Sequence, residues 1–194
     1  SGGDMPEIEE RVSELENMMK ELIYIFTQGQ IQHQEYRKSH EKFEKEMAAI
    51  KKDIALTLQK QGTLVEDMIA PNVKEIAEQK FGFVPPFLFM VRHKKQKPSD
   101  LSYIREFDVI AVYNERVIIV ESKSNPKTEY IKEFIDFLKS GELLEYYPEF
   151  TGKKIIPILA SLFIPEEVIK FLTKNRIYAM VLKGDIMDIV NDIS

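Results

Sequence analysis

The sequence lacks several features that would point to particular classes of protein. None of its 194 residues is cysteine, which excludes a disulfide scaffold, a thiolate zinc site and a cysteine nucleophile. The three histidines leave little material for a histidine metal cluster. No apolar run approaches the ~18–20 residues that span a bilayer, and no signal peptide is visible. We therefore expect a cytoplasmic protein without membrane contact.

The chain also has no excess of positive charge and none of the common catalytic signatures. Its 27 basic and 32 acidic residues give a net charge of −5, which argues against a uniformly basic mode of nucleic-acid binding. A glycine-rich phosphate loop, a Gly-x-Ser-x-Gly elbow and a His-Glu-x-x-His motif are all missing, so functions of the kinase, α/β-hydrolase and zinc-protease types have no support. The composition, 44% hydrophobic and 30% charged, is that of a folded protein.

The first part of the chain, residues 1–61, has the composition of a long helical segment. Between Ile8 and Gln61 there is no proline, and Gly29 is the one glycine. The apolar residues recur in alternating steps of three and four, which is the a/d spacing of a coiled coil. The residues in this frame are Ile8, Val12, Leu15, Met19, Leu22, Phe26, Phe43, Met47, Ile50 and Ile54.

Two arrangements of this segment are compatible with the spacing. The frame passes through Gly29 without a skip, which favours one continuous helix of roughly 54 residues and ~80 Å. Such a helix needs a partner to bury its stripe, and we expect a homodimer, parallel or antiparallel. The alternative is a helical hairpin that reverses near residues 27–32, because glycine weakens a helix there.

Residues 62–194 predict a separate α/β domain, a three-layer arrangement with a mixed sheet. Their order is helix, three strands, helix, strand, helix, strand, and the end of the chain is expected to be a short helix or irregular. Pro71 interrupts the first helix and either kinks it or starts a second one. The expected helices are 64–81, 127–147 and 165–174, and the expected strands are 87–91, 103–113, 116–124, 155–163 and 177–182, with a polar loop at 92–97.

The strands 103–113 and 116–124 read as a β-hairpin with Asn114 and Glu115 at its turn. With a two-residue turn, opposed residues sum to 229, so Asp108 lies opposite Glu121. Directly opposed side chains share a face with Cβ atoms ~5 Å apart, and alternation adds Lys123 to that face while Ser122 points away. Two like charges at this spacing are unfavourable unless a positive group lies between them. A divalent cation or Lys123 would serve.

The series Asp108, twelve intervening residues and Glu121-Ser122-Lys123 resembles the signature of the PD-(D/E)XK nuclease superfamily. The order of elements after residue 62 also resembles its restriction-endonuclease-like αβββαβ core. The resemblance implies that Asp108 and Glu121 hold Mg²⁺, with Mn²⁺ as a substitute, and that Lys123 is the catalytic lysine. It further implies a third acid on the first core helix, for which Glu66 is the best match and Asp67 the fallback. Phe107 stands where the family name has proline.

The resemblance implies a metal-dependent nuclease that hydrolyses phosphodiester bonds of DNA and is dimerised by its helical segment. A catalytically silent module of the same fold, binding nucleic acid or protein, and a structural adaptor are the alternatives. Arg92, Lys94, Lys95 and Lys97 form the strongest local basic cluster. These side chains either contact phosphates or belong to a solvated loop.

Overall fold

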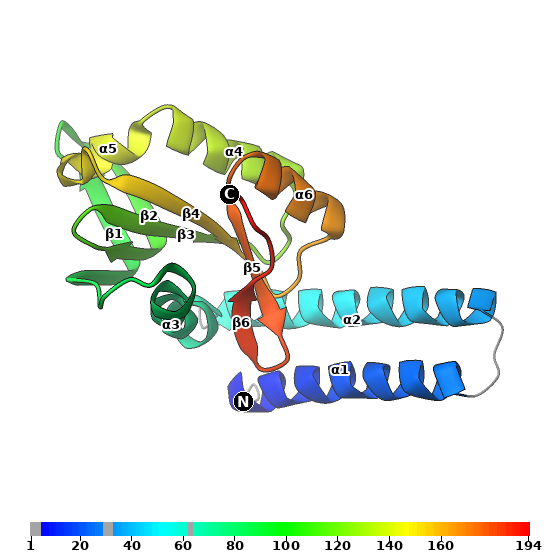
Figure 1. Cartoon of the computed structure of the whole chain (residues 1–194). Coiled ribbons are helices and arrows are strands. Elements are labelled where there is room, and N and C mark those ends of the chain that lie inside the picture. The colour runs from blue at the N-terminus through cyan, green and yellow to red at the C-terminus, as the bar shows by residue number, and fades with distance from the viewer. Residues whose placement is uncertain (1–4, 29–32, 62–63) are drawn as a thin grey trace.

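A mixed six-stranded sheet forms the centre of the protein (Figure 1). The computed structural model describes residues 5–28, 33–61 and 64–194. Neighbouring strands follow the order of the chain, with β3, β4 and β5 parallel and the remaining pairs antiparallel. The strands are β1 Leu88–Lys97, β2 Asp100–Val112, β3 Arg116–Ser122, β4 Lys154–Ala160, β5 Tyr178–Lys183 and β6 Ile186–Ile189.

Helices cover both faces of this sheet, as expected for a mixed α/β fold (Figure 1). On one face, a π-helical segment η1, Leu64–Ile69, leads directly into α3, Ala70–Phe81. Pro71 occupies the first turn of α3, so it starts a second helix, where its missing N–H leaves no bond unmade. The other face carries α4 Thr128–Lys139, α5 Glu142–Tyr146, the short 3₁₀ helix η2 Pro148–Phe150 and α6 Glu166–Lys174.

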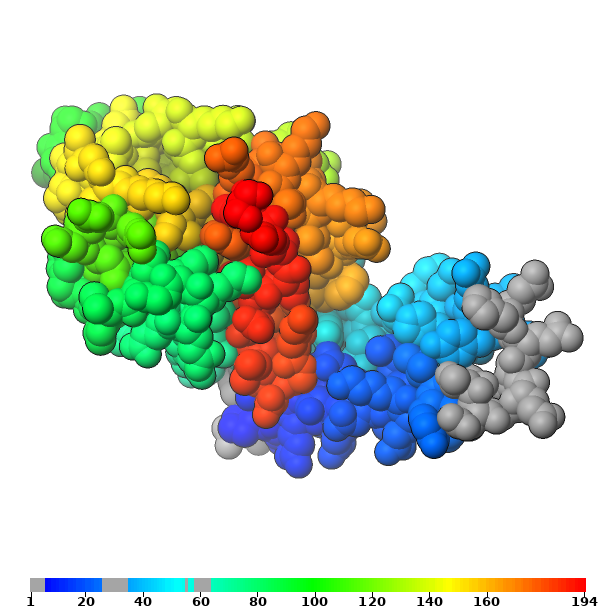
Figure 2. All heavy atoms as spheres, in the orientation of Figure 1, coloured from blue at the N-terminus to red at the C-terminus, as the bar shows by residue number. Residues whose placement is uncertain are grey.

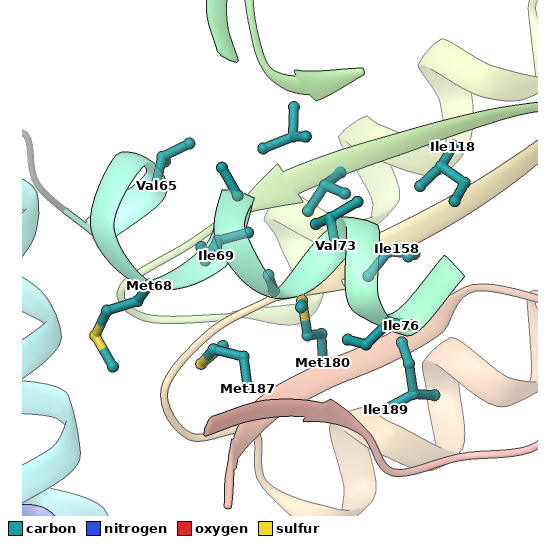
Figure 3. Close-up of a cluster of buried hydrophobic side chains, with 14 of the residues drawn as sticks. Val65, Met68, Ile69, Val73, Ile76, Ile118, Ile158, Met180, Met187 and Ile189 are labelled. Atoms are coloured by element: carbon teal, nitrogen blue, oxygen red, sulfur yellow. The ribbon is translucent and has the colours of Figure 1, made fainter. Parts of the chain in front are cut away.

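Two apolar clusters bind these layers to the sheet. Along β3, Ile118 and Val120 pack on the α3 side while Val117 and Ile119 pack on the α4 side, because successive strand residues point to opposite faces. The central strands are apolar on both faces, as is usual for strands covered by helices on both sides. Figure 3 shows the α3-side cluster, in which the labelled side chains are Val65, Met68, Ile69, Val73, Ile76, Ile118, Ile158, Met180, Met187 and Ile189.

Three elements differ from the sequence predictions. The helix expected over 127–147 is broken at Gly141, whose φ of +77° ends one helix and starts the next. The expected polar loop 92–97 is the second half of strand β1, because its backbone pairs with β2 and edge strands tolerate lysine. The chain end forms strand β6 after a turn at Gly184, where φ is +64°.

The N-terminal segment folds as two helices, α1 Met5–Gln28 and α2 His33–Gln61, which lie antiparallel within one chain (Figure 1). The expectation of one continuous helix is therefore wrong, and the hairpin alternative is confirmed. Residues 29–32 lie outside the described residues. Pairing within the chain brings the two apolar stripes together without a second molecule. A second molecule is therefore not needed to cover the apolar stripes. The homodimer and strict coiled-coil geometry both stay predictions.

One end of this helical pair is fixed to the sheet while the other extends away from it (Figure 2). Val12 of α1 is fully buried in the α3-side cluster. Lys51 of α2 forms an ion pair with Glu16 of α1 at 2.6 Å and donates a hydrogen bond to the carbonyl of Leu182 at 3.3 Å. The N–H of Gly184 donates to the second oxygen of Glu16 at 2.8 Å. Two helices and the β5–β6 turn thus meet at one largely buried ion pair.

The described helices contain no span that is both long enough and apolar enough to cross a membrane.

Removing one member of the Glu16–Lys51 pair should destabilise the protein. We expect Lys51→Met to lower the free energy of unfolding by about 2–3 kcal/mol, because the carboxylate of Glu16 stays largely buried without its partner. Adding Glu16→Gln should restore most of this loss, because no charge then remains at the contact. Urea denaturation of both variants provides the measurement. Lys42→Met, at an exposed position of α2, is the matched control, and an equal effect there would contradict the role of the pair.

Candidate functional site

The β2–β3 hairpin has the register that the two-residue turn predicts. Val109 pairs with Val120 and Val112 with Val117, so opposed residues sum to 229. The N–H of Tyr113 donates to the carbonyl of Arg116 at 2.8 Å and closes the turn. The apolar arms lie in the core, which fixes the register because a slip by one residue would turn every side chain to the opposite face.

Beyond Val109 and Val120 the two strands diverge. β2 continues beside β1 alone, whereas β3 continues beside β4, where Glu121 pairs with Leu159. Asp108 and Glu121 therefore stand at the fork rather than in a paired ladder. The separation gives room between two carboxylates that would repel each other if they were directly paired.

A small pocket of about 210 Å³ opens at this fork. Three of the predicted site residues, Asp108, Glu121 and Lys123, line it together. Among the described residues, the pocket is lined by Leu64, Val65, Arg92, Glu106, Asp108, Glu121, Ser122 and Lys123. The pocket thus gathers side chains from η1, β1, β2 and the end of β3.

Ser122 fixes the carboxylate of Asp108. Its backbone N–H and its Oγ donate hydrogen bonds to Oδ2 of Asp108 at 2.8 and 2.9 Å. We expected Ser122 to point away from the site, and that expectation is wrong. The alternation rule applies to a paired ladder, and at the fork the Asp108 side chain reaches across to the end of β3 instead. One oxygen of Asp108 is thereby held in place by two donors.

Glu121 carries the strongest electrostatic perturbation at the site. Burial of its carboxyl, followed by the nearby charge of Asp108, raises its pKa to about 7. Lys123 Nζ, at 3.9 Å, and Arg105 Nη2, at 3.8 Å, offset part of this effect. Burial also raises the pKa of Asp108, against the two bonds from Ser122. The two acids are costly to ionise together without a further positive charge.

Lys123 is held at the edge of the pocket by its backbone and by an aromatic ring. Its N–H donates to the carbonyl of Ala160 on β4 at 3.0 Å, which extends the β3–β4 pairing. Its Nζ lies 5.2 Å from the centre of the Tyr130 ring on α4, within range of a cation–π contact. The ammonium group is therefore positioned beside Glu121 from the α4 side.

Glu66 does not line the pocket. It lies in the first turn of η1 with its side chain half exposed, and its Oε1 is 3.5 Å from Nη1 of Arg92. Asp67 is exposed and does not line the pocket either. Among the described residues, no three His, Cys, Asp or Glu side chains are grouped so that they could hold a metal ion. Three carboxylates line the pocket, those of Glu106, Asp108 and Glu121, and Glu106 is bonded to Arg92. A further acid from η1 stays a prediction.

The basic segment divides between two places. Arg92 lines the pocket, and Lys94 is exposed. Lys95 Nζ lies 5.4 Å from the centre of the Tyr147 ring. Lys97 forms ion pairs with two glutamates of α5, at 3.1 and 3.5 Å, and its side chain is 13% exposed. Lys97 is therefore engaged at α5 and Lys95 at the neighbouring ring of Tyr147, and of these four residues Arg92 is the one that lines the pocket.

Three of the polar side chains that shape the site, those of Arg92, Ser122 and Arg105, were not expected there from the sequence. Arg92 was expected in a loop, and Ser122 was expected on the other face. Arg105 has its guanidinium 3.9 Å from the centre of the Phe137 ring and braces Glu121 from the α4 side. Glu106 pairs with Lys94 in the sheet, and its carboxylate bonds Arg92 at 3.0 Å. The hairpin register, in which opposed residues sum to 229, predicts Glu106 opposite Lys123 and so a further acid beside Asp108 and Glu121.

Comparison with known proteins adds little to this geometry. No family model matches the sequence, and no curated protein is significantly similar to it. Among solved structures, the chain is similar to Can2 from Sulfobacillus thermosulfidooxidans, solved in complex with cyclic tetra-adenylate, at 14% identity and a TM-score of 0.40. The match covers 90% of this chain and 50% of that one, so this chain spans half the length of Can2. A likeness at this level decides neither the family nor the function.

The raised pKa of Glu121 predicts a distinctive dependence of stability on pH. The folded protein holds this proton up to about pH 7, whereas the unfolded chain releases it near 4.5. Between these values the folded state binds more protons, so stability falls as pH rises. In metal-free protein we expect wild type to lose about 2 kcal/mol between pH 5 and 7.5 relative to Glu121→Gln.

Urea denaturation at several pH values measures this difference. Glu115→Gln, which removes an exposed carboxylate at the turn of the same hairpin, is the matched control and should follow wild type. A difference between wild type and Glu121→Gln that stays constant across this pH range would contradict the raised pKa.

Proposed function

We propose that this protein is a metal-dependent nuclease of the PD-(D/E)XK type that hydrolyses phosphodiester bonds of DNA. The observation that carries the proposal is the pocket at the β2–β3 fork, which gathers Asp108, Glu121 and Lys123. These are the residues that the sequence signature selects. Twelve residues separate Asp108 from Glu121 along the chain, but the two are close in space, because the hairpin register brings them to the same end of the hairpin.

The chemistry of the side chains fits a magnesium ion. Mg²⁺ prefers oxygen ligands and commonly binds through one or two carboxylates, keeping water and substrate phosphate as its other ligands. Asp108 and Glu121 supply such a pair. Burial raises the pKa of both carboxyls, so a bound cation would favour their ionised forms. Mn²⁺ favours the same oxygen ligands and is the expected substitute. Glu66 would be a third ligand only if its side chain left Arg92.

The residues of the chain have distinct roles in this proposal. When bound, a divalent cation lowers the pKa of a water and offsets charge on the phosphate. Ser122 holds Asp108 through two hydrogen bonds, so one ligand is preorganised. Glu121 must release its proton to act as a ligand, which its pKa of about 7 permits near neutrality. Lys123 Nζ, beside Glu121, would donate a hydrogen bond that orients the attacking water.

The silent module is the second candidate, and one observation favours it. Lys123 and Arg105 both lie within 4 Å of Glu121, and Arg92 enters the same pocket. These cations offset part of the acidic charge without a metal ion. A protein that uses the pocket only for its internal ion pairs would bind no divalent cation there and would cleave nothing.

Cleavage assays with site variants separate these two candidates. We expect wild type to cut plasmid or junction DNA with Mg²⁺ or Mn²⁺, whereas Asp108→Asn and Lys123→Met lower the rate by about 100-fold or more. Asp108→Asn should also abolish Mn²⁺ binding in a calorimetric titration, while Lys123→Met should leave binding in place. This split assigns Asp108 to the metal and Lys123 to the reaction.

Lys127→Met is the matched control, because this exposed lysine lies four residues beyond Lys123 and outside the pocket. It should cut at the wild-type rate. A wild-type protein that is inert on DNA and RNA with both metals would contradict the nuclease and leave the silent module. Cutting of RNA alone would contradict DNA as the substrate and retain the chemistry.

A further inference from the structure

Arg92 has an unusual backbone conformation in the middle of strand β1. Its φ is +48°, in the left-handed region that non-glycine residues rarely adopt. The pairs Val91–Val109 and His93–Phe107 on either side of it place Arg92 directly opposite Asp108. The strained residue thus lies across the sheet from a predicted metal ligand. Backbone strain of this kind is concentrated at functional sites.

Both strands change the direction of their side chains at this pair, although their register is unbroken. On the near side, Val91 and Val109 pack on the α3 face. On the far side, Phe107 belongs to the α4-side cluster, and Lys95 lies over a ring of that same cluster. The odd-numbered residues of both strands therefore point to the α3 face on one side of the Arg92–Asp108 pair and to the α4 face on the other side. The left-handed conformation of Arg92 is the local cause of this inversion on β1, and it sends the guanidinium toward η1.

The guanidinium of Arg92 lies among three carboxylates. Its Nε donates to Oε1 of Glu106 at 3.0 Å, and its Nη1 lies 3.5 Å from Oε1 of Glu66. It also lines the pocket that contains Asp108. Glu66 is half exposed, and its contact with Arg92 holds its side chain. A cation fixed in this place offsets the same negative charge that a divalent ion would.

We propose that Arg92 is a positioning residue that competes with the metal ion for Glu66. This inference rests on the proposed metal site of Asp108 and Glu121. In the metal-free protein, Arg92 holds Glu66 and Glu106. A divalent cation at Asp108 and Glu121 repels the guanidinium, because two like charges in a small pocket repel each other strongly. Glu66 is then released and becomes an additional oxygen ligand. Metal binding therefore displaces an internal cation, and Arg92 sets the metal affinity.

Calorimetric titration of the whole chain with Mn²⁺ tests this competition. We expect Arg92→Gln to bind Mn²⁺ about 10-fold more tightly than wild type, because the competing charge is gone. Adding Glu66→Gln should abolish that gain, because the released ligand is then missing. Arg92→Lys keeps the charge and should stay within about 3-fold of wild type. Lys127→Gln is the matched control, since it removes an exposed cation outside the pocket, and it should not change the affinity.

Arg92→Asn serves as a second variant, because asparagine adopts a positive φ more easily than most residues and preserves the strand. It should show the same gain as Arg92→Gln. Equal affinities of wild type and both variants would overturn the proposal, and so would a gain that survives Glu66→Gln. Binding in the Arg92 variants with none in wild type would support it.

The same titration distinguishes this inference from the proposed nuclease. If Mn²⁺ binds wild type and Asp108→Asn abolishes binding, the metal site stands whatever the Arg92 variants show. If neither wild type nor the Arg92 variants bind Mn²⁺, the metal site and the competition are both overturned.

Discussion

The site depends on one constraint: two carboxylates, Asp108 and Glu121, are held at the point where β2 and β3 separate. If the hairpin had continued as a ladder, the two acids would face each other at a distance that the sheet does not tolerate without a partner. Separation of the strands gives space for a pocket, and the hydrogen bonds from Ser122 fix one acid at its rim. Burial of the same place raises the pKa of Glu121. The fork therefore supplies the geometry and the electrostatic demand for a cation together.

The helices on the two faces of the sheet determine which positively charged side chains lie near these two carboxylates. From the α4 side, Arg105 and Lys123 approach Glu121, each supported by an aromatic ring. From the other side, η1 brings Glu66 to Arg92. Cations and acids thus approach the fork from both faces, and no single helix defines the site. The packing of α3 and α4 on the sheet fixes the relative positions of these charges, so core packing and site electrostatics are coupled.

The parts of the structure that sequence predicted are those that local rules determine. A two-residue turn and two apolar arms specify the hairpin register, and that register brings Asp108 and Glu121 to one end. The order of helices and strands follows from periodicity in the same way. The change of side-chain direction at Arg92 could not be predicted by such rules. The alternation rule assumes a regular strand, and an arginine in the left-handed conformation does not alter the hydrophobic pattern of the sequence. The sequence left the helical hairpin as an alternative to one continuous helix, because the heptad frame is the same whether the partner helix is in the same chain or another.

The inversion at Arg92 and Asp108 also explains why an acidic pocket adjoins a basic strand. Before the inversion, the odd-numbered residues Phe89 and Val91 of β1 pack on the α3-side cluster. After it, the odd-numbered residues lie toward α5, where Lys97 forms ion pairs with two glutamates. Had the strand stayed regular, Lys95 and Lys97 would have faced the η1 side together. The single change of face at Arg92 removes these two charges from the pocket and admits one. The pocket therefore holds two cations, Arg92 and Lys123, beside its carboxylates, although the chain as a whole is acidic.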